Sequence, residues 1–540
     1  MNFRIPKNNT YKIFIVAFLL LNILVMLFFG MKKNGYNVDE LYTYGLSNSY
    51  YEPFINISEN TELSSDYFKE YFTVQEDEKF SYKSVYDNQS RDVHPPFYYF
   101  LFHTIASFTP NVFSKWTGIT LNILLFIACW LILYKLSKLF LKDSYLSLLP
   151  SVIWGFSSGA ISSIVFIRMY VLMTVWVLST SYFHMKAIKM QTFKKSTLGW
   201  IYLITFLGVM THYYYIVFAC FMSIIYCIYL LYKKKIKYLV GYCLTMFGSL
   251  GSAVLFYPAL INHIFLGYRG TEAVTNFSET TSSLQTTFFN FASYYEIVNS
   301  SLFSNTLNYF LLIFVLLILY VSLKKLFERN RKKLTERQEI LWEKNKKSIL
   351  MLLGLLFSSV MYVFIIAQVA PYKADRYIFP ILPLIILAAV VIFVLFISQL
   401  FADKKVCFIL LGFFVVFNLV YTYTNESVNY LYENRDMSYL TDHENIINKQ
   451  TAVLFYDNSR VSGAQVTNSS QYLVYHDSSY IFNTKTGIEK MKELEQDQKR
   501  TIIYFGYVVD AETFAAEILE KTNFTKYTLI DDSIGAYIFE

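Results

Sequence analysis

Long apolar blocks are the feature of this 540-residue sequence that most limits its fold. A helix needs about 20 apolar residues to cross the hydrocarbon core of a bilayer. The chain is 55% hydrophobic and 16% charged, whereas soluble domains are about a quarter charged. This composition excludes a disordered or collagen-like protein and predicts a polytopic α-helical membrane protein. Eleven spans are predicted, at 13–30, 117–134, 145–166, 169–187, 198–210, 213–232, 239–260, 307–323, 349–369, 377–401 and 406–423.

The positive charges between the blocks predict how the chain is oriented in a cell membrane. Cytoplasmic ends of spans are enriched in lysine and arginine. With a cytoplasmic N-terminus, the lysine clusters at 135–142, 186–195, 233–237, 324–347 and 404–405 all lie inside, and Lys32 and Lys33 are the exception. The first block is too long for a signal peptide and no cleavage site follows it, so we interpret it as a retained span. The segments predicted outside are 34–114, 257–305, 370–376 and everything after 424.

The apolar segment Phe97–Phe108 is too short for a normal span, since it has about a dozen residues between proline-containing turns. If it crossed the bilayer, every later lysine cluster would move to the outside. We therefore place it at the outer surface or in a shallow dip. The count of eleven depends on this placement, and twelve or thirteen spans stay open.

Two modules follow from the distribution of polar residues. Residues 1–425 form the predicted membrane module, with 34–114 as its first outer loop, and residues 426–540 form a small extracytoplasmic α/β domain. In the second module the predicted strands are 452–456, 472–475, 501–505, 527–530 and 535–539, and the predicted helices are 487–496 and 511–521.

Charge and cysteine usage exclude several function classes. From Asn425 onward, 18 acidic residues face 10 Lys or Arg, so the overall excess of +7 belongs to the membrane module and indicates contact with anionic lipid rather than nucleic acid. All five cysteines lie in apolar blocks, which excludes a disulfide framework or a zinc cluster. The sequence contains neither a GxxxxGK[ST] nor an HExxH motif.

Five polar clusters fall on the predicted outer face. Each cluster taken alone can be interpreted without a function, as a solvated acidic pair, a helix start or an interfacial Arg or Tyr anchor. Together they bring carboxylates near guanidinium, ammonium and imidazole groups, which suits a phosphate-bearing lipid substrate. The clusters are Asp39-Glu40, Asp92-Val93-His94-Pro95-Pro96-Phe97-Tyr98-Tyr99, Arg168-Met169-Tyr170, Thr211-His212-Tyr213-Tyr214-Tyr215 and Tyr372-Lys373-Ala374-Asp375-Arg376-Tyr377.

These motifs, in this order and with Pro380 and Pro383 after the last, resemble the GT-C superfamily of membrane glycosyltransferases. The branch most similar contains the protein O-mannosyltransferases and the lipid A aminoarabinose transferases. The resemblance covers roughly residues 1–425 and is strongest up to Tyr215, while the acidic tail lies outside it. It implies transfer of a sugar from a polyprenyl-phosphate carrier to an extracytoplasmic glycan, lipid or protein acceptor, with inversion at the anomeric carbon.

The resemblance also implies site residues. Asp39 matches the position of the general base, and Glu40 matches the second acidic position, which orients the acceptor or shares the base role. Proximity to the lipid surface is expected to desolvate Asp39 and raise its pKa. Cations must neutralise the charge that grows on the departing phosphate, and the candidates for donor binding are His94, Arg168, Tyr170, His212, Lys373 and Arg376, with Arg91 as an additional cation.

Cofactor and donor are left open by the sequence. Some GT-C relatives use a divalent metal, but the acidic residues of the first loop show no spacing typical of an oxygen cage, so no metal ligands are predicted. Val171 follows Arg168-Met169-Tyr170 where mannosyltransferases often carry further acidic residues, which leaves the donor sugar undetermined.

Two other function classes compete with a glycosyltransferase. A transporter or flippase for a lipid-linked glycan also has many spans and interfacial cations, although it should place ionisable residues near the bilayer midplane. A non-catalytic membrane scaffold would use the acidic tail to recruit a partner.

Overall fold

The computed structural model describes residues 10–59, 61–327, 332–400, 405–433, 435, 450–495 and 500–540. Within these residues, seven helices are long and apolar enough to cross a membrane, which makes the chain a multi-pass membrane protein. They lie in α1 (Thr10–Lys32), α6 (Lys115–Phe140), α11 (Tyr214–Tyr232), α12 (Ile236–Phe256), α17 (Lys332–Val369), α18 (Leu382–Leu400) and α19 (Lys405–Thr424).

The remaining predicted spans take other forms, so the count of eleven is not confirmed. The segment predicted at 145–166 is broken into η1 (Leu146–Leu148), α7 (Leu149–Gly155) and α8 (Ser158–Val165), with a bend of 55° between the two halves. It breaks where Ser157 caps α8 by accepting from the Ala160 N–H, because a capping serine ends one helix and starts the next. Counted as one span, this pair raises the number to eight.

Two predicted spans form helices that length and composition do not mark as spans. The 15 residues of α10 (Lys195–Val209) extend about 22 Å, less than the roughly 30 Å of a bilayer core. Helix α9 (Tyr170–Met190) ends in lysines, which lowers its apolarity. The predicted span at 307–323 lies in α16 (Leu307–Phe327), which is 21 residues long and has part of its side chains outside the described residues.

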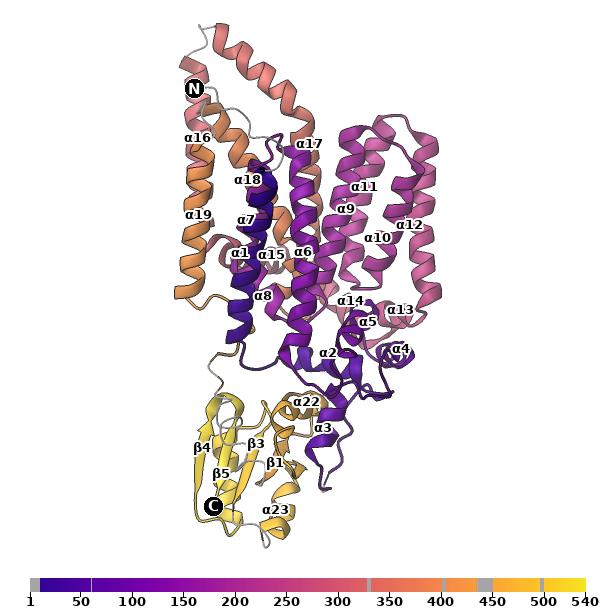
Figure 1. The fold of residues 1–540 in the computed structure, drawn as a ribbon, viewed down its shortest axis with the longest axis vertical. Helices are drawn as coiled ribbons and strands as arrows, with labels where there is room; N and C mark the ends of the chain where they lie inside the picture. The colour runs from indigo at the N-terminus through magenta and orange to yellow at the C-terminus, as the bar shows by residue number, and fades with distance from the viewer. Residues whose placement is uncertain are drawn as a thin grey trace.

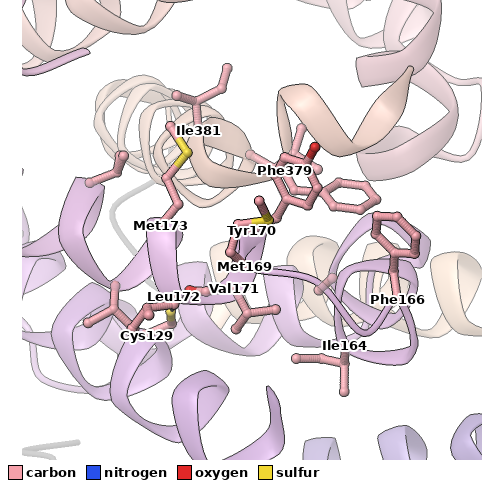
Figure 2. Close-up of a cluster of buried hydrophobic side chains, with 14 of the residues drawn as sticks. Cys129, Ile164, Phe166, Met169, Tyr170, Val171, Leu172, Met173, Phe379 and Ile381 are labelled. Carbon is pink, nitrogen blue, oxygen red and sulfur yellow. Dashed lines mark hydrogen bonds between the residues drawn. The ribbon is translucent and has the colours of Figure 1, made fainter. Parts of the chain in front are cut away.

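The long helices stand side by side in one bundle (Figure 1). Helix α6 packs against α9, α10 against α12, and α11 against α17. The core around the start of α9 is shown in Figure 2, where Met169, Tyr170 and Met173 meet Phe379 and Ile381 of η4 (Phe379–Ile381). All of these side chains are buried, so the start of α9 is fixed in the bundle.

Short helices cover one end of the bundle, between it and the C-terminal domain (Figure 1). Helix α5 has ten residues, so the prediction that the segment from Phe97 is too short for a normal span is confirmed. The short helices at this end are α2 (Val38–Asn48), α3 (Ser65–Phe72), α4 (Tyr82–Ser90), α5 (Phe97–Ala106), α13 (Ala259–Ile261), η2 (Asn262–Leu266), α14 (Tyr268–Thr281) and η3 (Asp375–Tyr377). The longer α15 (Leu284–Phe303) packs against α17 and α8.

The predicted α/β tail is present as a five-stranded sheet in the order β2-β1-β3-β5-β4. Strand β1 is parallel to β2 and β3, and β5 is antiparallel to β3 and β4. The elements are β1 (Thr451–Tyr456), α22 (Ser462–Leu473), β2 (Ser479–Asn483), α23 (Gly487–Glu495), β3 (Thr501–Phe505), α24 (Ala511–Lys521), β4 (Tyr527–Asp531), η5 (Asp532–Ile534) and β5 (Ala536–Phe539).

One predicted strand of the tail, 472–475, is wrong, since it falls on the end of α22 and the turn after it. Two parallel neighbouring strands need a crossover connection, and α22 supplies it between β1 and β2. The strand that was missed is β2, directly after that crossover.

The C-terminal domain rests on the segment that carries the acidic motif. Helix α22 packs against α2 and α3. Leu63 and Ser479 exchange two backbone hydrogen bonds of 2.8 Å, and the Tyr36 N–H donates to Gln471 Oε1 at 3.0 Å. The domain therefore lies directly over the segment that follows α1.

Candidate active site

Asp39 lies in the first turn of α2, and the local sequence dictates this turn. Asn37 caps the helix by accepting from the Asp39 N–H at 3.0 Å, and Glu40 Oε2 accepts from the Asn37 N–H at 2.6 Å. This reciprocal capping box, with two acids in the first turn, is a strong helix start. The Asp39 side chain remains 32% exposed, so a substrate can reach its carboxylate.

Two arginines meet at Asp39. Arg376 Nη2 lies 2.9 Å from Asp39 Oδ2, and Arg168 Nη1 donates to the Asp39 carbonyl oxygen at 3.0 Å. Burial would raise the pKa of Asp39, but the guanidinium groups of Arg168 and Arg376, together with His94, outweigh it and hold the pKa below its usual range. The expected rise in this pKa is therefore wrong, because the neighbouring cations dominate over desolvation.

Glu40 is bonded on both carboxylate oxygens and is fully buried. Besides the capping bond, it lies 3.0 Å from Lys33 Nζ and accepts from the Ile167 N–H at 2.8 Å. Both side chains of the Lys33–Glu40 pair have no exposed surface. Glu40 thus ties the end of α1 and the loop before α9 to the start of α2, and Lys33, the exception to the charge pattern, is paired inside the protein.

Arg168 is held in the loop between α8 and α9 by several acceptors. Its Nη1 also donates to Thr43 Oγ1 at 3.2 Å and to the Tyr99 hydroxyl at 3.0 Å. Its Nη2 lies 3.4 Å from His94 Nε2. Because the guanidinium is fixed by α2 and α5 together, its position relative to Asp39 is set before any substrate binds.

Two histidines border the arginines. His94 Nδ1 lies 2.9 Å from Asp92 Oδ2, and the His94 and His212 rings have centroids 5.9 Å apart. Burial lowers the pKa of His94, and Arg168 lowers it further although Asp92 opposes this. Burial also lowers the pKa of His212 well below its usual value. Both imidazoles are therefore neutral at pH 7 and act as hydrogen-bonding groups.

Aromatic rings surround Arg376. Its guanidinium carbon lies 5.4 Å from the ring centroid of Phe166, 5.2 Å from that of Tyr372 and 5.5 Å from that of Tyr377. One guanidinium nitrogen donates to the Tyr372 hydroxyl. Tyr170 lies in the same wall, with its ring centroid 5.4 Å from that of His212 and 6.3 Å from that of Tyr377. The arginine is stabilised as a cation by these ring faces.

The structure thus joins six of the eight predicted site residues around one carboxylate, namely Asp39, His94, Arg168, Tyr170, His212 and Arg376. Glu40 follows Asp39 in α2 and holds the start of that helix in place. Lys373 makes a different contact, since its Nζ donates to the Ala367 carbonyl at 2.6 Å, near the end of α17. Arg91 is the exposed residue that ends α4.

Among the described residues, no group of three or more His, Cys, Asp or Glu is arranged to hold a metal ion. The ionised groups around Asp39 are instead arginines. A site of this composition can bind a phosphate through two guanidinium groups and accept a proton on a carboxylate.

Two solved structures resemble the chain along nearly its whole length. One is the crystal structure of ArnT from Cupriavidus metallidurans bound to undecaprenyl phosphate, with 9% identity, a TM-score of 0.48, and 97% of each chain covered. The other is ArnT from the same organism in the apo state, with 10% identity, a TM-score of 0.44, and 97% of this chain and 98% of that chain covered. No protein-family model matches the sequence, and no curated protein matches it. Both likenesses are weak in identity and in superposition, so the function is inferred from this chain's own side chains.

Several residues at the site were missed by sequence reasoning. Thr43 and Phe166 contact the arginines but lie in ordinary polar or apolar runs. Tyr430 is far from the other site residues in the sequence, and its ring stacks on that of Phe166 with centroids 4.1 Å apart. Asp92, Tyr99 and Tyr372 belong to the clusters selected from the sequence, but no role was assigned to them there.

Proposed function

We propose that this protein is an integral-membrane glycosyltransferase that moves a sugar from a polyprenyl-phosphate carrier to a hydroxyl group of an extracytoplasmic acceptor. Asp39 is the general base, and Arg376 and Arg168 stabilise the departing phosphate. The main observation in support is the pair formed by Asp39 and Arg376, 2.9 Å apart, with Arg168 beside it. A base and two fixed cations in one accessible place are what this transfer requires.

The reaction needs both kinds of group. The acceptor oxygen attacks the anomeric carbon as the bond from that carbon to the phosphate oxygen breaks, and the acceptor proton passes to Asp39. A sugar phosphodiester with one negative charge becomes a lipid phosphate with two. Preorganised guanidinium groups stabilise the second charge as it develops. Direct displacement by the acceptor inverts the anomeric centre.

The arginine that now neutralises Asp39 has a second role in this scheme. When a donor phosphate binds, Arg376 and Arg168 share their hydrogen bonds with it, so Asp39 loses part of its electrostatic stabilisation. Its pKa then rises from the depressed value of the free protein. Asp39 therefore becomes the stronger base only when the donor is present, which limits unproductive proton transfer.

The other predicted residues take supporting roles. His94 and His212 are neutral and offer hydrogen bonds to the phosphate or sugar, while Tyr170 lines the sugar position. Glu40 holds α2 in place rather than contacting the acceptor, since its oxygens are engaged. Lys373 is a less favoured phosphate ligand because its ammonium is bonded to the end of α17.

The proposed topology places the N-terminus in the cytoplasm and residues 426–540 outside the cell membrane, over the site. An acceptor then approaches from the outer face, between this domain and the helical bundle. Glycans, lipids and proteins of the cell envelope are all compatible with that approach. Reporter fusions after Gly35 and after Glu426 test the topology, since fusion activity on opposite sides of the membrane would separate Asp39 from the tail and contradict it.

The central test uses purified protein in liposomes with a radiolabelled polyprenyl-phosphate sugar. We expect Asp39→Asn to reduce transfer by at least about 1,000-fold at normal expression, as loss of a general base and of a charge partner for the arginines requires. Asp77→Asn, which changes an exposed carboxylate in the same outer segment, serves as the control and should transfer normally. Undiminished transfer by Asp39→Asn would remove this residue from the mechanism.

The same liposomes separate a transferase from a lipid transporter. A transferase forms a new glycosidic bond that survives extraction and is detected by mass spectrometry of the acceptor. A transporter changes only the leaflet in which the labelled lipid is found. Lipid movement without a new bond would favour the transporter.

A further inference from the structure

The segment that leaves α19 returns to the site before it enters the C-terminal domain. We define residues 428–433 as the strap. Val428 and Leu431 are buried in a small apolar cluster with Phe29, Ile161 and Val165, at the end of α1 and along α8. The strap is therefore packed against the membrane module rather than running free between two modules.

The strap binds the turn that carries Arg376. Asn429 Nδ2 donates to Asp375 Oδ2 at 2.7 Å, and the Tyr430 hydroxyl donates to Asp375 Oδ1. Asp375 Oδ1 also accepts from the Arg376 N–H at 2.7 Å. Asp375 is only 8% exposed, so its carboxylate depends on these partners. The two strap side chains thus fix the backbone of η3 directly at Arg376.

The strap also supports the aromatic face behind Arg376. The Tyr430 ring stacks on Phe166 with centroids 4.1 Å apart and an interplanar angle of 22°. Phe166 is one of the rings that the Arg376 guanidinium covers, and it lies two residues before Arg168. Tyr430 is consequently placed behind both cations of the site.

A third set of contacts reaches the segment before Asp39. The Tyr430 carbonyl accepts from Lys33 Nζ at 2.7 Å, and the Leu431 carbonyl accepts from the Asn34 N–H at 2.7 Å. Tyr432 accepts from Asn37 Nδ2 at 3.0 Å, and Asn37 is the cap of α2. One short segment therefore touches the elements that carry Asp39, Arg168 and Arg376.

The backbone of the strap is itself in an uncommon conformation. Tyr430 has φ 68° and Tyr432 has φ 56°. A non-glycine residue in this left-handed region is strained and persists where its surroundings over-determine it. Two tyrosines in this region, each bonded to a different part of the site, indicate that the strap is held by those bonds.

We propose that Tyr430 is a positioning residue that holds Arg376 against Asp39 through the Asp375 carboxylate. This inference rests on the proposed function. It assigns the segment after the last span a part in transfer, and it explains how the C-terminal domain is coupled to the site. If the strap only joined two modules, loss of one hydroxyl would change stability and leave the turnover of the folded protein intact.

Tyr430→Phe tests the proposal because it keeps the ring and removes the bond to Asp375. We expect kcat to fall about 10-fold to 100-fold, as small misplacements of catalytic groups do, while the KM for the acceptor stays within about twofold. Tyr50→Phe removes a hydroxyl from a half-exposed tyrosine just after α2 and should leave kcat unchanged. Wild-type kcat in folded Tyr430→Phe would overturn the proposal.

A double-mutant cycle with Asp375→Ala shows whether Tyr430 acts through Asp375. If it does, the kcat of the double variant is about that of the less active single variant, because the second substitution removes no further interaction. If the two losses multiply, Tyr430 acts by another route and the proposal fails.

The thermal unfolding of the same four proteins distinguishes this inference from the proposed function. Suppose that the losses in unfolding midpoint of Tyr430→Phe and Asp375→Ala are coupled but the wild-type protein transfers no sugar. That result would contradict the glycosyltransferase assignment and still establish the contact between Tyr430 and Asp375. Normal wild-type transfer with uncoupled kcat values would contradict the positioning role alone.

Discussion

The guanidinium of Arg376, in the turn before α18, lies 2.9 Å from the carboxylate of Asp39, in the first turn of α2. The ion pair leaves the side chain of Asp39 32% exposed. The pair joins the proposed base to a proposed phosphate ligand. Replacing either residue should therefore alter both the electrostatic environment of the other residue and the response of the protein to donor lipid. Four predictions follow from this relationship and from the contacts around it.

Replacement of Arg376 should lower turnover even when the positive charge is kept. We expect Arg376→Gln to lower kcat by about 100-fold or more, because a preorganised donor to the developing phosphate charge is lost. Arg376→Lys should recover only part of this, since lysine lacks the planar fork. Steady-state kinetics in liposomes measure both, with the exposed Arg460→Gln as control. Full activity in Arg376→Lys would show that a point charge suffices.

Donor lipid should stabilise the protein through its arginines. Any ligand that binds only the folded protein raises the free energy of unfolding with the logarithm of one plus the ratio of ligand concentration to Kd, and so raises the unfolding midpoint. We expect a polyprenyl phosphate to raise the midpoint of the wild type and of Asp39→Asn, and to have little effect on Arg376→Gln. A thermal-shift titration checks this. Equal shifts in all three proteins would place the phosphate elsewhere.

Stability should depend on pH through Asp39 with a definite sign. Its pKa in the folded protein is depressed, whereas the unfolded value is about 3.9. A depressed carboxylate contributes stability that is fully present above the unfolded pKa and is lost as pH falls through the folded pKa. The difference in unfolding midpoint between wild type and Asp39→Asn should therefore be constant from about pH 6 to 8 and shrink below about pH 4. A difference that grows on acidification would contradict the sign.

The buried pair of Lys33 and Glu40 should be important for stability rather than for chemistry. Glu40→Gln leaves the Lys33 ammonium buried without its carboxylate, which typically costs about 3–5 kcal/mol. Removing both charges in Lys33→Met/Glu40→Gln should recover much of this loss. Glu76→Gln, which breaks an exposed pair with Lys79, should change little. The unfolding midpoints of these variants test the prediction. A stable but inactive Glu40→Gln would instead support the catalytic role that the resemblance implies for Glu40.

Much of the fold follows from local patterns. Apolar length predicted the long helices, and alternation with turns predicted four of the five strands. The errors share a cause, because they lie where tertiary contacts override local preference. The bend between α7 and α8 and the crossover helix α22 both occupy runs that read locally as something else.

The site shows the same division. Five short motifs, all assigned to one face by the lysine pattern, contain six residues that meet around Asp39. Arg376 and Lys373 lie three residues apart, and only the turn decides which of the two cations faces the carboxylate. The sequence could not find Tyr430, whose partners Asp375 and Phe166 are far away in the chain.

The sequence by itself determined that this chain spans a membrane many times and carries its acids, histidines and arginines at the same end, because apolar length and lysine distribution are local quantities. Only the tertiary structure decided the sign of the Asp39 pKa shift, the burial of Glu40 with Lys33, and the return of Tyr430 to the site. Electrostatic energies depend on distances between atoms, and those distances are set when segments far apart in sequence pack together.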